Sequence, residues 1–261
     1  MITLLNYLKT NIFDAHVHYF SHRGDILDKL DKSYDAYVGF MDVEFNQIDK
    51  YDKDSVIKYY SEFIQKLPKN YLLLATGTDS ETMIELHKKF PEYISGFGEC
   101  KCYGYYRENG EKFPLPFGNL DWIYDMCEYN RKFKLPVYIH YDMDCDERVN
   151  DFKKLLSKFP EIPFILCHFG IGREKQLQCY INTKNLLNIY PNLYTDISYT
   201  ASEFFIQNPS LLKGLPQRLL IGTDVNMKGI EEGNLSKLYD NTKKIGQYIN
   251  CNTAFIKLFK K

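Results

Sequence analysis

A short segment near the start of the chain carries the residues best suited to chemistry. Residues 14–18 spell Asp-Ala-His-Val-His and follow the apolar residues 11–13, which predict a strand leading into them. Residues two apart on a strand point to the same side, so we expect Asp14, His16 and His18 to share one face. Neutral imidazole is the commonest metal ligand in proteins. The segment therefore predicts part of a metal site, if other strands supply further ligands.

Polar residues also end four later apolar runs. Glu99 ends the run that starts at residue 94, and His140 follows residues 137–139. His168 follows residues 164–167, and Asp224 follows residues 219–223. Apolar strands that end in this combination of imidazoles and carboxylates are unlikely by chance. The predicted metal ligands are therefore His16, His18, Glu99, His140, His168 and Asp224.

These residues need strands that end at one place, and the chain alternates short apolar runs with amphipathic segments. The predicted strands are residues 11–16, 36–41, 71–76, 93–99, 136–140, 163–168, 192–196 and 218–223. The predicted helices are residues 55–67, 80–90, 120–133, 147–159 and 174–190. Such alternation is typical of a parallel sheet in an α/β protein.

Eight strand–helix units in about 250 residues match the size of a (β/α)8 barrel, also called a TIM barrel. We expect a single domain over residues 1–261, because no linker or low-complexity segment divides it. An open, doubly wound sheet is the alternative, although no glycine-rich phosphate loop follows the first strand. In a barrel the carboxyl ends of all eight strands surround one mouth, where catalytic groups lie.

The order of these motifs resembles the amidohydrolase superfamily of metal-dependent hydrolases, and within it the TatD-type and amidohydrolase-related branches. The matching motifs are the histidine pair after strand one, Gly98-Glu99, Ile139-His140, the Cys-His-Phe-Gly sequence at 167–170 and the Gly-Thr-Asp sequence at 222–224. By this resemblance His16, His18 and Asp224 would hold one metal, and His140 and His168 a second. Glu99 would bridge the two.

The resemblance implies catalysis by a metal-activated water. Asp224 would act as general base, and His168 would contact substrate if only one metal were bound. We expect one or two divalent ions per chain, most simply zinc; manganese, iron, cobalt and nickel remain open. The favoured substrate is a small, anionic amide, ester or lactone. The alternatives are a TatD-like phosphodiesterase or deoxyribonuclease, a metal-dependent decarboxylase, and a binding protein without catalysis.

Several residues near the expected mouth have less certain roles. Lys101, Arg107 and Arg173 are candidate substrate-binding cations, since they follow strands that carry metal ligands. Asp196 ends the seventh predicted strand, where a structural and a substrate-facing role are both open. We expect His87 to lie on the surface.

Composition and charge limit the partners. The chain has 44% hydrophobic and 26% charged residues, which are globular values, and a net charge of −1. That charge does not favour nucleic acid or an anionic membrane as a partner, so we expect a small-molecule substrate. The seven cysteines have no disulfide-scaffold spacing, and residues 1–8 lack the basic leader and apolar core of a signal peptide. We therefore expect a cytoplasmic protein; the oligomeric state is open.

Overall fold

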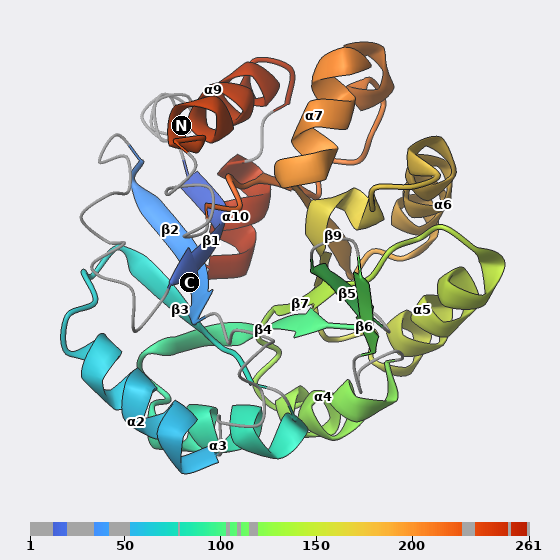
Figure 1. Ribbon diagram of the computed structural model, residues 1–261. Coiled ribbons are helices and arrows are strands. Elements are labelled where there is room, and N and C mark those ends of the chain that lie inside the picture. The colour runs from blue at the N-terminus through green and yellow to red at the C-terminus, as the bar shows by residue number, and fades with distance from the viewer. Residues whose placement is uncertain are drawn as a thin grey trace, which may run out of the picture.

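Eight parallel strands form a barrel in the computed structural model of this protein (Figure 1). The structure describes residues 13–19, 34–41, 53–77, 79–102, 105–108, 111–114, 120–225, 233–249 and 252–259. The barrel strands, in sheet order, are β1 (Phe13–Tyr19), β2 (Ala36–Met41), β3 (Tyr71–Ala75), β4 (Ile94–Lys101), β7 (Val137–His140), β8 (Phe164–Leu166), β9 (Leu193–Ile197) and β10 (Leu219–Ile221). All eight lie where the alternation of apolar runs predicts them.

Helices surround this barrel, as Figure 1 shows. The described α-helices are α2 (Lys53–Ile64), α3 (Ser80–Lys89), α4 (Tyr124–Asn130), α5 (Asp146–Lys158), α6 (Gln176–Ile189), α7 (Tyr199–Gln207), α9 (Leu235–Gly246) and α10 (Asn252–Phe259). The 3-10 turns are η3 (Asp121–Ile123), η4 (Cys167–Gly170) and η5 (Pro209–Leu212). Helices α7, α9 and α10 are additional to the predicted ones. None of the described helices is long and apolar enough to cross a membrane.

The first and last strands meet and close the sheet. Val17 and Val225 form a parallel bridge, and the Val225 carbonyl accepts a hydrogen bond of 2.9 Å from the His18 amide. The Asp224 amide donates to the His16 carbonyl, also at 2.9 Å. A Cβ on Gly222 would lie 2.4 Å from the Cβ of His16, so only glycine permits this close approach. The closed barrel confirms the predicted fold and rules out the open sheet.

The strand faces divide the core into two layers. An inner cluster takes alternate strand residues such as Val38, Tyr138 and Leu220, whereas an outer cluster packs the other strand face against the helices. Helix α10 belongs to the inner cluster, where the Phe255 ring stacks on Phe13 with 4.2 Å between centroids. Because Phe13 begins β1, α10 covers the amino ends of the strands and leaves their carboxyl ends for function.

Strand β1 departs from simple alternation. Its pairing with β2 shifts register between Asp14 and Val17, and Ala15 packs in the inner cluster whereas Val17 packs in the outer one. The prediction that Asp14 shares the face of both histidines was therefore wrong, because the irregularity changes which side chains point inward. Asp14 instead accepts hydrogen bonds from the Thr223 amide at 3.0 Å and the Thr223 hydroxyl at 2.6 Å.

The segment after β4 contains a hairpin that the sequence pattern did not predict. Its strands, β5 (Tyr105–Glu108) and β6 (Glu111–Pro114), pair in antiparallel register. Arg107 lies on β5 opposite Lys112, and its side chain is outside the described part of the chain.

The prediction that His87 lies on the surface was wrong. His87 is buried, because its ring packs against Phe97 and Phe133 between α3 and its neighbours.

Candidate metal centre

Six of the predicted site residues converge at the carboxyl ends of the barrel strands. His16 and His18 come from β1, Glu99 from β4 and His140 from the last position of β7. His168 lies in the η4 turn directly after β8, and Asp224 lies three residues beyond β10. Sets of three of these residues bring one ligand atom each within 4.8 Å of one another: His16, His168 and Asp224; His16, His18 and Glu99; and Glu99, His140 and His168.

Glu99 lies at the middle of this cluster. Its Oε1 atom is 2.7 Å from His140 Nδ1, 3.9 Å from His168 Nε2 and 4.0 Å from His16 Nε2. One carboxylate oxygen is therefore within 4 Å of imidazoles from strands β1 and β7 and from the η4 turn. This is the position that a ligand shared between two cations would need.

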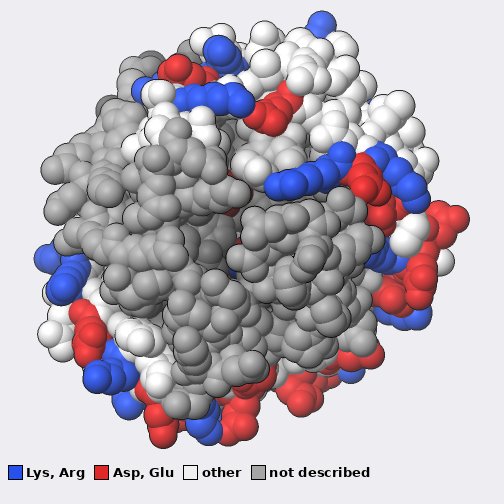
Figure 2. Space-filling model, in the orientation of Figure 1, with Lys and Arg blue, Asp and Glu red and all other residues white. Residues whose placement is uncertain are grey.

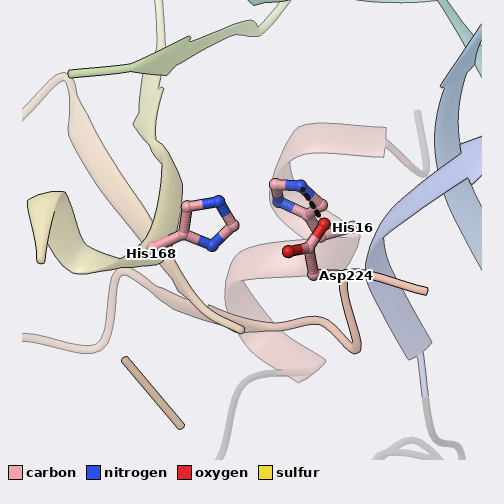
Figure 3. Close-up of side chains that lie close together, drawn as sticks. All are labelled: His16, His168 and Asp224. Carbon is pink, nitrogen blue, oxygen red and sulfur yellow. Dashed lines mark ion pairs between the residues drawn. The ribbon is translucent and has the colours of Figure 1, made fainter. Parts of the chain in front are cut away.

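Asp224 lies on the β1 side of the same cluster. Its Oδ1 atom is 2.7 Å from His18 Nε2 and 3.4 Å from His16 Nε2. Figure 3 shows the His168 ring, carried by the turn after β8, pointing toward the His16–Asp224 pair. Residues separated by more than 200 positions thus share one small volume, as a barrel mouth requires.

The two carboxyl groups are ionised despite their burial. Burial alone would raise the pKa of Glu99, but the neighbouring His140 and the Lys101 ammonium hold it well below its usual range. Burial also opposes the low pKa of Asp224, which results from hydrogen bonds with His16 and His18. Two buried anions in one cluster require positive charge close to them.

The pKa values of the histidines depend on burial and on the carboxylates beside them. Burial opposes protonation of His16, but Asp196 raises its pKa well above the usual value. The pKa of His140 is raised too, because Glu99 outweighs burial. His168 differs: burial lowers its pKa to about 4, so it is neutral at physiological pH. The raised pKa values of His16 and His140 favour protonated imidazoles beside the two carboxylates.

The donor set fits a divalent cation. Four imidazoles and two ionised carboxylates are the ligand types of zinc and related transition metals. A cation at the cluster would compensate Glu99 and Asp224 in place of the imidazole protons, and metal binding at such sites releases protons. The thiols of Cys100 and Cys102 do not belong to this set: both pack in the outer cluster, and burial raises the pKa of each well above its usual value.

Two of the predicted ligands have a left-handed backbone. His168 has a φ of 53° and Asp224 a φ of 57°, a region that residues other than glycine rarely occupy. Such conformations cost on the order of 1–3 kcal/mol and cluster at functional sites. At both positions the local fold gives up stability to direct a side chain into the mouth, which supports a functional role for the cluster.

A second layer of polar residues supports the histidines. Asp196, on β9, lies with one carboxylate oxygen 3.0 Å from His16 Nδ1, and Ser198 Oγ lies 2.8 Å from His168 Nδ1. The position of Asp196 at a strand end drew attention in the sequence, but its contact with His16 could not be deduced there. Ser198 carried no signal of its own, since buried serines are common.

The candidate substrate-binding cations lie at different depths. Lys101 Nζ is 3.8 Å from Glu99 Oε2, and its side chain is largely buried beside the cluster. Arg173 is exposed in the segment before α6, and within the described chain no ion pair joins it to the cluster. The assignment of the metal ligands and of these cations stays a prediction.

Charges of both signs alternate over the described surface around this face of the barrel (Figure 2). Lys53 pairs with Glu81, and Lys237 with Glu203, so exposed cations have nearby acidic partners. A track for single-stranded nucleic acid needs a continuous positive groove. The described part of this surface does not present one.

Comparison with solved structures identifies enzymes that share this fold. A putative 2-pyrone-4,6-dicarboxylic acid hydrolase from Pseudomonas putida aligns over 96% of this chain and 98% of its own, with a TM-score of 0.60 and 15% identity. A dihydroorotase from Campylobacter jejuni aligns over 95% and 83%, with a TM-score of 0.52 and 15% identity. The chain shares the barrel fold of these enzymes.

A third structure, amidohydrolase 2 from Bifidobacterium longum subsp. infantis, aligns over 94% of this chain and 98% of its own, with a TM-score of 0.52 and 11% identity. A comparison with protein-family models gives no match, and neither does a comparison with the sequences of curated proteins. These likenesses establish the barrel. The TatD-type subdivision stays a prediction.

Proposed function

We propose that this protein is a metal-dependent hydrolase of the amidohydrolase superfamily, acting on a small anionic amide, ester or lactone. The observation that carries the proposal is the position of Glu99 Oε1, within 4.0 Å of imidazole nitrogens of His16, His140 and His168. Asp224, ionised and 2.7 Å from His18, completes the set on the opposite side. His16, His18, Glu99, His140, His168 and Asp224 would hold one or two divalent cations, with zinc the simplest candidate.

A divalent cation at this site would lower the pKa of a coordinated water from 15.7 to about 7. Asp224 would accept a proton from the attacking water at a carboxylate oxygen and deliver it to the leaving group, as a general base and then a general acid. Its low pKa keeps it ionised and ready to accept. His168, neutral because of its burial, would offer a nitrogen lone pair at the same point.

The preference for an anionic substrate is based on Lys101. Its ammonium group lies at the edge of the cluster, 3.8 Å from Glu99 Oε2. Strand β4 runs to Lys101, so the two side chains share a face and Lys101 lies nearer to the solvent. A substrate carboxylate could bind this ammonium while its reacting carbonyl lies deeper. The structural neighbour named for a pyrone dicarboxylic acid is compatible with an anionic lactone.

The test is a substrate panel assayed with metal-free and zinc-loaded protein. The panel contains lactones, amides and esters with and without a carboxylate, nitrophenyl phosphodiesters and single-stranded DNA. We expect zinc-dependent hydrolysis of a carboxylate-bearing lactone, amide or ester. Full activity in protein shown to be metal-free would contradict the proposal.

The same panel separates the remaining alternatives. Cleavage of phosphodiesters or DNA alone would establish the nuclease hypothesis. Release of carbon dioxide without hydrolysis would establish a decarboxylase. Exposed Asp240 on α9 offers a matched control, since Asp240→Asn changes the same charge as Asp224→Asn outside the site. Equal activity of these two variants would remove Asp224 from the mechanism.

A further inference from the structure

Asp196 touches two of the predicted ligand histidines at once. Its Oδ2 atom is 3.0 Å from His16 Nδ1. Its Oδ1 atom accepts hydrogen bonds from the hydroxyl of Ser198 and, at 3.2 Å, from the backbone amide of His168. The Ser198 oxygen in turn lies 2.8 Å from His168 Nδ1. Asp196, Ser198 and His16 are fully buried, so no solvent competes for these bonds.

The hydrogen atoms in this network have one consistent arrangement. Oδ1 of Asp196 accepts from a backbone N–H and a hydroxyl, and a carboxylate oxygen without a proton can only accept. His16 Nδ1 must therefore donate to it. Ser198 has one hydroxyl proton and uses it toward Asp196, so its oxygen must accept from His168 Nδ1. Both imidazoles thus carry a proton on Nδ1.

The opposite nitrogens point into the metal cluster. His16 Nε2 lies 3.4 Å from Asp224 Oδ1, and His168 Nε2 lies 3.9 Å from Glu99 Oε1. We propose that Asp196 is a positioning residue that fixes the Nδ1 proton of both His16 and His168, directly for the first and through Ser198 for the second, so that both offer Nε2 to the metal cluster. This inference builds on the proposed function, because it names what prepares the ligands of that site.

Asparagine at position 196 could satisfy only one of the two histidines. An amide has a single acceptor oxygen, and its nitrogen can only donate. The His168 backbone amide is a fixed donor, so the amide oxygen should face His168 and Ser198. The amide nitrogen would then face His16 Nδ1, which must lose its proton to accept. His16 would carry its proton on Nε2, where a metal could no longer bind.

Three variants separate these roles. Asp196→Asn should disturb His16, Ser198→Ala should disturb only His168, and Thr195→Val is the matched control. Thr195 is a buried residue of the same strand whose hydroxyl bonds to backbone carbonyls, that of Leu166 at 2.7 Å and that of Asp196 at 3.3 Å. Removing its hydroxyl therefore tests for general damage to β9.

Two measurements on the full chain detect changes in zinc binding and in histidine protonation without any substrate. Zinc affinity is measured by competition with a chromogenic chelator, and nitrogen-15 NMR of histidine-labelled protein reports which ring nitrogen carries a proton, with and without zinc. We expect Asp196→Asn to weaken zinc binding by about 10–100-fold, as loss of such supporting contacts does. The Nδ1–H resonance of His16 should disappear. In Ser198→Ala that of His168 should change while His16 stays as in the wild type.

The inference would be overturned if both Nδ1–H resonances and the zinc affinity of Asp196→Asn matched those of Thr195→Val. If Asp196→Asn did not fold, Ser198→Ala would decide: an unchanged His168 resonance and zinc affinity would refute the coupling through Ser198. A wild-type protein that binds no zinc would refute the proposed function instead. The resonances of the metal-free protein would still decide the role of Asp196.

Discussion

The substitution Glu99→Gln should remove one of two metals from the site. Glu99 Oε1 lies 2.7–4.0 Å from imidazoles of His140, His168 and His16. A cation held by any of these histidines would therefore be close to the negative charge of Glu99. At an effective dielectric constant of about 20, each unit charge of a cation about 4 Å from the carboxylate contributes about 4 kcal/mol. Since 1.4 kcal/mol is a factor of ten, the weaker-bound divalent cation should lose affinity by at least about a thousandfold.

The assay is the zinc content per chain after equilibrium dialysis, together with chelator competition for the affinities. We expect two zinc ions per wild-type chain and close to one in Glu99→Gln. Glu92→Gln, an exposed substitution of the same kind, is the control and should keep both. If Glu99→Gln kept both metals while Lys101→Met lost one, the bridge would be a carboxylated lysine. One zinc in both the wild type and Glu99→Gln would show a mononuclear site.

Three further predictions concern the base, the substrate cation and a buried histidine. Asp224→Asn should lower kcat by at least about 10² with the fold intact, because asparagine also accepts the left-handed backbone there; Asp240→Asn should leave kcat unchanged. Lys101→Met should raise KM by about 10–100-fold through loss of a charge-assisted contact, whereas exposed Lys213→Met should not; a changed zinc content would argue against this role. Burial and the nearby Lys132 lower the pKa of His87 in the folded protein below its usual value of 6.5. In acid the unfolded state therefore binds more protons than the folded state, and the free energy of unfolding falls as the pH drops below about 6.5. Urea unfolding at about pH 8 and about pH 5.5 should show a smaller acid loss in His87→Gln than in the wild type; equal losses would place the acid sensitivity elsewhere.

The strand ends could be predicted from the sequence because each combines an apolar run with one polar residue at a fixed place. Glu99, His140, His168 and Asp224 all follow this rule, and a parallel barrel brings such positions together. The strands can be predicted without knowledge of the packing, because their apolar composition indicates that they are buried. The eight strands and the grouping of the six site residues could therefore be predicted.

Other features depend on three-dimensional contacts that periodicity does not encode. The register shift in β1 separates Ala15 from Val17 and turns Asp14 toward Thr223, although strict alternation would place Asp14 beside the histidines. Histidine is classed as a polar residue, but His87 lies among the rings of Phe97 and Phe133, where a neutral imidazole packs as an aromatic residue. The link from Asp196 through Ser198 to His168 joins the end of β9 to the η4 turn, and only the folded chain reveals it.

Anomalous diffraction from crystals of the zinc-loaded protein tests the central claim most directly. Data collected on both sides of the zinc absorption edge locate bound zinc without any assumption about activity. We expect anomalous peaks inside the barrel mouth, coordinated by Nε2 of His16 and His168 and by the carboxylates of Glu99 and Asp224. A zinc-loaded crystal whose anomalous peaks all lie outside this cluster would contradict the account.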